Sequence, residues 1–205
     1  MSRLVSILPR AAIALAAGAL SVAAQATTFN QAITTDGQWY AFSVDAGSAS
    51  DQRATWIDLD YNSTAGNAQD LSFSFTVLDQ AILRVVDLYA AGDTYSVTVS
   101  SSTGSSFSSS TSAVAQLDLS SGVFANDVDA AWADAIDFSR GQWLLAAGTY
   151  TVTGALLQSA KDGAGLALST SGAVSVTAVP EPSSLALALA ALASVIFVSR
   201  RRRQG

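Results

Sequence analysis

Short runs in which every second residue is apolar recur through the middle of this 205-residue sequence. A period of two with one polar face is the pattern of half-buried antiparallel strands. Glycines such as Gly92, Gly122, Gly141 and Gly148 separate the runs and are expected to form turns. The pattern predicts an all-β domain, an antiparallel β-sandwich or jelly roll. The apolar members of the runs are Tyr40, Phe42 and Val44; Ile57, Leu59 and Tyr61; Phe73, Phe75 and Val77; Tyr95, Val97 and Val99; and Tyr150 and Val152.

Two segments break the alternation. Apolar residues at helical spacing between Val128 and Ile136 predict a short helix over one end of the sandwich, with Asn126 as its cap. The alternative is an Asp-rich loop over residues 126–137. From Ser100 to Ser112, eleven of thirteen residues are Ser or Thr, which predicts a mobile loop, with O-glycosylation as the functional alternative.

The N-terminus has the composition of a secretory signal peptide. Arg3 and Arg10 give a positive start, and residues 11–20 form an apolar stretch too short to span a bilayer comfortably. Ala24 and Ala26 flank Gln25 as a small-x-small cleavage site. We therefore expect a signal helix within residues 1–26, export through the Sec translocon, and cleavage after Ala26.

The C-terminus combines a turn, an apolar run and a cationic end. Pro180 and Pro182 cannot lie inside a helix, so they mark the start of the helix that residues 183–199 predict. The Ala- and Leu-rich run from Leu185 to Val198 is at the short end of what can span a bilayer. Four arginines, Arg200, Arg201, Arg202 and Arg203, resist translocation and predict a cytoplasmic C-terminus.

These three parts together resemble the PEP-CTERM sorting signal of Gram-negative bacteria. The resemblance rests on Pro180, Glu181 and Pro182, the apolar run and the arginine cluster, and covers residues 180–205. It implies recognition by an exosortase, a membrane-embedded transpeptidase-like enzyme, and processing near the Pro-Glu-Pro tripeptide. It also implies an inner-membrane precursor that is later transferred to the cell surface or an extracellular exopolysaccharide matrix, as in a biofilm.

Removing both ends leaves residues 27–179 as one secreted domain, large enough for a core of its own. This segment holds fifteen of the sixteen acidic residues but four of the ten basic ones, so its formal charge is −11, against −6 for the whole chain. A nucleic-acid partner is therefore not expected, because phosphate contacts need a cationic face. The chain has no Cys and no His, which excludes cysteine and Ser-His nucleophiles and imidazole or thiolate metal sites.

The composition leaves only hard cations that prefer oxygen ligands plausible, calcium above all. Four carboxylates fall within eleven residues, and a helix would scatter them. No cofactor is therefore expected, and the weak calcium candidates are Asp127, Asp129, Asp134 and Asp137.

No motif for catalysis is recognised, so the sequence predicts a non-catalytic structural or matrix-interaction protein. The rival hypothesis is a carbohydrate-binding module for the matrix polysaccharide, since exposed tryptophans could stack on sugars. Trp39, Trp56 or Trp143 exposed in a shared groove would favour it, whereas core packing is the plainer role for these residues and Trp132. An Asp-dependent hydrolase would need two carboxyl groups facing each other across a cleft.

Overall fold

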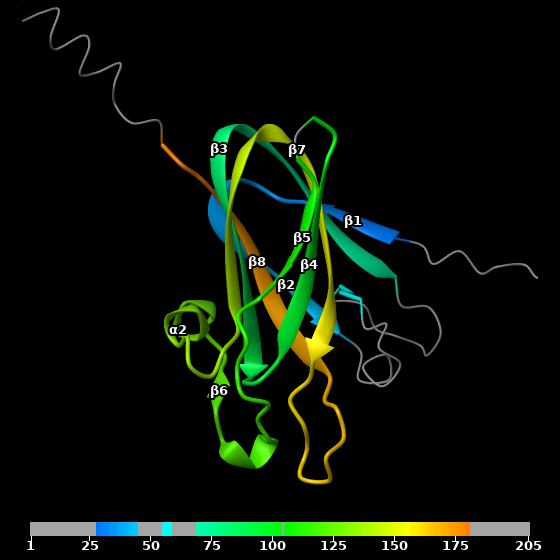
Figure 1. Ribbon diagram of the computed structural model, residues 1–205, viewed down its shortest axis with the longest axis vertical. Coiled ribbons are helices and arrows are strands. Elements are labelled where there is room, and N and C mark those ends of the chain that lie inside the picture. The colour runs from blue at the N-terminus through cyan, green and yellow to red at the C-terminus, as the bar shows by residue number, and fades with distance from the viewer. Residues whose placement is uncertain (1–27, 45–54, 59–68, 104, 181–205) are drawn as a thin grey trace, which may run out of the picture.

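The strands of the protein form one connected, mostly antiparallel sheet (Figure 1). The computed structural model describes residues 28–44, 55–58, 69–103 and 105–180. Along the main path the strand order is β2-β8-β3-β7-β4-β5, and β1 and β6 each pair with β3. The strands are β1 (Thr28–Ala32), β2 (Asp36–Val44), β3 (Asp70–Ala90), β4 (Thr94–Ser101), β5 (Phe107–Ser110), β6 (Phe124–Ala125), β7 (Arg140–Gln158) and β8 (Thr170–Ala178).

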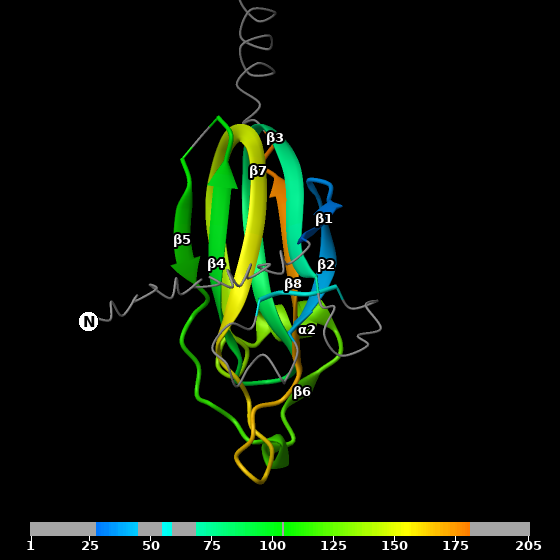
Figure 2. The ribbon, with the colours of Figure 1, turned by 90° about the vertical axis from the view of Figure 1, so that its right-hand side faces the viewer.

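The sheet is folded over on itself because its two longest strands, β3 and β7, bend together. Their antiparallel register shifts between Val77 and Gln80, opposite Gly148 and Ala146. Before this point β3 also pairs with β1, in parallel, and after it β3 also pairs with β8. Both strands therefore run through two halves of the sheet, and Figure 2 shows them arching over one end of the domain.

The main core lies between the two halves. Phe42, Val85 and Val174 point inward from the half that contains β2 and β8. Phe73 and Val97 meet them from the half that contains β4. The prediction of an all-β, mostly antiparallel domain is confirmed, with the parallel β1–β3 pair as the exception. The sandwich or jelly-roll description stays a prediction, because the strands are joined in one sheet.

A short segment, residues 55–58, brings Trp56 into the middle of this core. The Ile57 N–H donates to the Ser43 carbonyl, and the Trp56 N–H donates to the Gly154 carbonyl, so the segment is tied to β2 and to β7. The indole of Trp56 is fully buried and stacks on Phe42, with 4.0 Å between the ring centroids. Trp56 is therefore a core residue.

A second, smaller cluster lies on the outer face of the half sheet that holds β8. Helix α2 (Val128–Ala133) covers this face and buries Ala131 against Val86 and Ala173. The predicted helix is confirmed but shorter than expected, and its cap is Asp127 rather than Asn126, since the Asp127 carboxylate accepts the Ala130 N–H at 2.8 Å. Ile136, which the helical spacing placed on the buried stripe, is 82% exposed.

Other expectations are wrong in detail. Residues 107–110 of the Ser-rich segment, predicted to be a loop, form β5 and pair with Ser96–Val99 of β4. Gly141 and Gly148, predicted to form turns, lie within β7. Gly92 and Gly122 do lie outside the strands and adopt positive φ angles of 112° and 69°. A 3₁₀ turn at Leu119–Ser121 ends at Gly122.

Candidate functional site

The folded domain ends one residue before the Pro-Glu-Pro tripeptide. The last residue of β8 is Ala178, whose N–H donates to the Thr35 carbonyl at 2.9 Å. The next N–H, that of Val179, donates to the Gln80 carbonyl at 2.9 Å. Pro180 has no N–H to donate, so it ends the ladder of hydrogen bonds that fixes β8.

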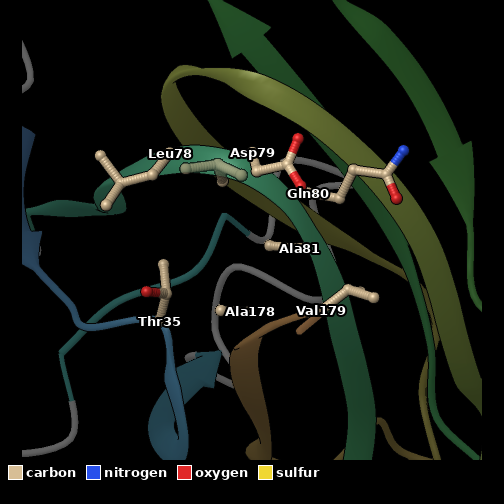
Figure 3. Close-up of a pocket in the computed structure, with 8 residues that line it drawn as sticks. Thr35, Leu78, Asp79, Gln80, Ala81, Ala178 and Val179 are labelled. Carbon is tan, nitrogen blue, oxygen red and sulfur yellow. The ribbon is translucent and has the colours of Figure 1, made fainter. Parts of the chain in front are cut away.

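A pocket of about 190 Å³ lies directly beside this junction (Figure 3). It is formed by the β3 bend, by Thr35 just before β2, and by the last residues before Pro180. Its lining residues are Thr35, Val77, Leu78, Asp79, Gln80, Ala81, Ala178 and Val179. The chain therefore leaves the domain next to a hollow that the bend of β3 creates.

A family model matches the chain where the domain ends. The model is described as the PEP-CTERM protein-sorting motif, and it covers residues 178–203. The chain carries a PEP-CTERM sorting motif. The match begins at Ala178, so the sorting motif overlaps the end of β8 by one residue. A search of curated proteins gave no match.

The sorting motif implies export, a membrane-anchored precursor and processing by an exosortase for surface localisation. Most predicted residues of the signals lie outside the described part of the structure. These are Ala24 and Ala26 at the N-terminus, Glu181 and Pro182, the run 185–198, and Arg200–Arg203. Of the helices in the described residues, none combines the length and apolar character needed to cross a bilayer.

Of the four acidic residues proposed for calcium, Asp127, Asp129, Asp134 and Asp137, three accept hydrogen bonds from the domain itself. Asp127 caps α2, and the Asp134 carboxylate accepts the N–H groups of Ile136 and Asp137. Asp129 accepts the indole N–H of Trp39 at 3.3 Å. Within the ranges that the structure describes, no group of three or more acidic residues is placed to hold a metal ion.

The four tryptophans do not form a shared groove. Trp56 is at the centre of the main core, and Trp143 packs at its border beside Phe107. Trp39 and Trp132 instead meet on the outer face, with ring centroids 5.8 Å apart. The candidates Trp39, Trp56 and Trp143 therefore lie in different places.

Two arginines complete the outer cluster around Trp132. The guanidinium groups of Arg84 and Arg140 lie 5.3 and 5.4 Å from the centre of the Trp132 ring, within the range of a cation–π interaction. Arg140 also donates to the Trp132 carbonyl. This outer cluster, defined as Trp39, Arg84, Trp132 and Arg140, joins α2 to β2, β3 and β7 and remains partly exposed.

A pair of buried acids was missed by the sequence reasoning. Asp87 on β3 and Asp93 before β4 are both fully buried. The Asp87 carboxyl accepts the N–H groups of Gly92 and Asp93 at 3.2 Å. Asp93 accepts the Ala160 N–H and the Thr170 hydroxyl, which reach it from the segment between β7 and β8 and from the start of β8.

Burial is the main cause of the raised pKa of both carboxyls, because a charge is costly in a low-dielectric interior. Burial, followed by the charge of Asp93, raises the pKa of Asp87 to about 9. Burial raises the pKa of Asp93 to about 6, although hydrogen bonds from Thr170 and Ala160 act against this shift. The available signal was the position of Asp87 in an otherwise apolar run, Val85 to Leu88.

Proposed function

We propose that the mature protein is a non-catalytic structural protein of the cell surface or of an exopolysaccharide matrix. In this proposal the chain is exported through the Sec translocon, loses residues 1–26, and is cut by an exosortase near Pro180, Glu181 and Pro182. The observation that carries the proposal is the sorting motif at residues 178–203, which follows the last strand of a folded β domain with no intervening domain.

The fold is consistent with a passive role for the domain. Its largest fully buried side chains are the aromatic residues Trp56, Tyr95 and Phe42, which pack in the core. The buried carboxyls of Asp87 and Asp93 bind backbone and hydroxyl groups of the domain itself. These contacts support a stable module that the sorting machinery delivers.

The test is mass spectrometry of the C-terminal peptides in the surface, medium and membrane fractions of the producing cell. We expect surface protein whose last peptide ends near Pro180–Pro182 and contains no part of residues 185–198. A variant with Pro180, Glu181 and Pro182 all changed to Ala should stay in the membrane fraction with Arg200–Arg203 intact. A matched control, Ser183→Ala with Ser184→Ala, should be processed like the unchanged chain.

The structural role has a separate readout. Cells that lack the protein should retain less exopolysaccharide at their surface than cells that carry it, while making the same total amount. If the protein without substitutions is found only at full length in the membrane fraction, with no shortened form elsewhere, the processing step is contradicted. Unchanged exopolysaccharide retention would contradict the matrix role alone.

The outer cluster favours a second candidate, a carbohydrate-binding module for the matrix polysaccharide. Trp39 and Trp132 are partly exposed beside two guanidinium groups, an arrangement that suits a sugar carrying acidic groups. Co-sedimentation with the purified polysaccharide should then weaken at least about tenfold for Trp132→Leu, a loss of about 1.4 kcal/mol of binding free energy. Trp143→Leu, which changes another half-buried tryptophan outside the cluster, is the control, and equal losses in both variants would argue against this site.

A further inference from the structure

The chain leaves the domain at the end where β3 and β7 bend. We call this the arch end and define it as residues 77–80 of β3 and residues 146–148 of β7. Val179 is fixed there by its hydrogen bond to Gln80, so the exit point of the chain is part of the folded structure. The segment between β7 and β8, residues 159–169, lies at the opposite end of the long axis (Figure 1).

The connection between the domain and the apolar run is short. Five residues, 180–184, separate the fixed Val179 from Leu185. Fully extended, this tether spans six Cα–Cα steps from Val179 to Leu185 and reaches at most about 22 Å. The second part of β7, from Gly148 at the arch end to Gln158, is about 33 Å long at the usual rise per strand residue. The tether is therefore shorter than this part of the domain. The opposite end, residues 159–169, consequently cannot lie at the membrane in place of the arch end.

The arch end also carries an apolar tip. Leu78, at the bend of β3, is 93% exposed and stands at the rim of the pocket beside the exit point (Figure 3). Ala146 and Ala147, in the bend of β7, are exposed as well. The nearby exposed carboxyls are Asp79 and Asp36, which favour a zwitterionic over an anionic lipid surface.

We propose that the short tether holds the arch end against the lipid surface in the membrane-anchored precursor, with Leu78 at the bilayer interface and residues 159–169 pointing away. This inference rests on the proposed function, in which the exosortase acts on a membrane-anchored precursor. It adds the orientation of the domain and identifies the bend of β3 as the surface that contacts lipid. It also places the pocket beside Val179 at the membrane face, where the processing enzyme acts.

The absence of cysteine from the chain allows a clean test with single labels. The full-length precursor is reconstituted in phosphatidylcholine vesicles that contain headgroup spin-labelled lipid. A fluorophore is attached to a Leu78→Cys variant or to an Ala164→Cys variant, which are matched because both positions are exposed. A third variant combines Leu78→Cys with twenty Gly and Ser residues inserted after Pro182.

We expect the spin-labelled lipid to quench the label of the Leu78→Cys variant at least about threefold more than that of the Ala164→Cys variant. In the lengthened chain the quenching should fall to the Ala164→Cys level. Equal quenching in the first two variants, or stronger quenching for Ala164→Cys, overturns the orientation. Quenching that persists in the lengthened chain overturns the role of the tether. Protein that does not float with the vesicles contradicts the anchored precursor itself, so the two failures can be told apart.

Discussion

Gly154 and Gly172 set how closely the aromatic rings of the core approach the sheet. A Cβ atom at Gly172 would lie 2.3 Å from the Phe42 ring and 2.7 Å from the Val86 carbonyl oxygen. A Cβ atom at Gly154 would lie 2.2 Å from the Trp56 ring and 2.7 Å from the Ser96 carbonyl oxygen. Because each site is bounded by backbone as well as by a ring, neither can relax by moving one flexible side chain.

Gly172→Ala should therefore destabilise the domain by about 1–3 kcal/mol, the usual cost of overpacking a core. The measurement is the free energy of unfolding in urea, followed by circular dichroism. Gly163→Ala is the control, since nothing lies within 4 Å of its Cβ position, and it should change the stability by less than about 0.5 kcal/mol. Equal stabilities for the two variants would show that the sheet yields more easily than this packing implies.

The role of such glycines could not be predicted from sequence. A glycine between apolar residues is compatible with a turn, a bulge or a ring packed on the backbone, and only the ring above it distinguishes these. Gly141 is an example, because the indole of Trp143 lies 2.1 Å from its Cβ position although the sequence indicated a turn. The ring that packs on Gly172 belongs to Phe42, which lies 130 positions away in the chain. Local sequence patterns do not reveal such a distant contact.

At the scale of elements, the buried acid pair joins the β3–β4 turn to the start of β8. Asp87 holds the turn through two backbone N–H groups, and Asp93 holds Ala160 and Thr170. Tyr95 adds to the connection, since its hydroxyl donates to the Ser171 carbonyl at 3.0 Å. Burial raises the pKa of Tyr95 well above its usual value, so the hydroxyl stays a donor.

The buried pair Asp87 and Asp93 predicts that the free energy of unfolding of the domain falls as the pH rises. Both carboxyls bind a proton more tightly in the folded than in the unfolded chain, where their pKa is near 3.8. Their contribution is therefore fully present below about pH 4 and is lost as the pH rises through the folded values of about 6 and 9. The melting temperature should drop by at least about 5 °C between pH 5 and pH 9.

Asp87→Asn should remove most of that drop, because the amide keeps the shape of the carboxyl and cannot ionise. Asp79→Asn, at an exposed position, is the control and should melt with the unchanged pH dependence. The measurement is thermal unfolding at pH 5, 7 and 9 for all three proteins. A flat profile for the unchanged chain would mean that the pair is not buried in solution as it is in the structure.

Strands were predictable from sequence where one face meets the core and the other meets solvent. This holds for Phe73 to Val77 and for Tyr95 to Val99. It fails for the second part of β3 and for β8, because helix α2 and the outer cluster cover the face that would otherwise be polar. The neighbours Val85 and Val86 are accordingly both buried, and such an apolar pair breaks the period of two. In β8, residues 173–176 are all buried, including the polar Ser175.

At the scale of the whole molecule, β8 is the central connection of its half of the sheet. It pairs with β2 on one side and with β3 on the other, and seven of its nine residues, Thr170 to Val176, are buried. We predict that a chain ending at Val179 unfolds cooperatively at the same temperature as the full-length protein in detergent. A chain ending at Ser169 should show no cooperative transition by circular dichroism, and a normal transition would show that β8 is dispensable.

The sorting motif could be predicted from sequence, because its turn, apolar run and arginines are contiguous and each has a local physical signature. The orientation of the domain relative to that motif could not. It depends on the bend of β3 at Leu78 and on the hydrogen bond from Val179 to Gln80, a contact across 99 positions of the chain. The bend was not predicted, although apolar Leu78 and polar Asp79 reverse the alternation that runs from Phe73 to Val77.

The position of β8 has a consequence for the timing of export. A chain that crosses a membrane from its N-terminus delivers β8 last, although β2 and β3 need it between them. If the chain is exported in this direction, as proposed, residues 170–178 emerge just before the sorting motif, and the domain would complete its sheet at about the moment its anchor reaches the bilayer. Until then, the edges of β2 and β3 that pair with β8 would lack a partner. Completion of the sheet and arrival of the sorting motif would therefore coincide.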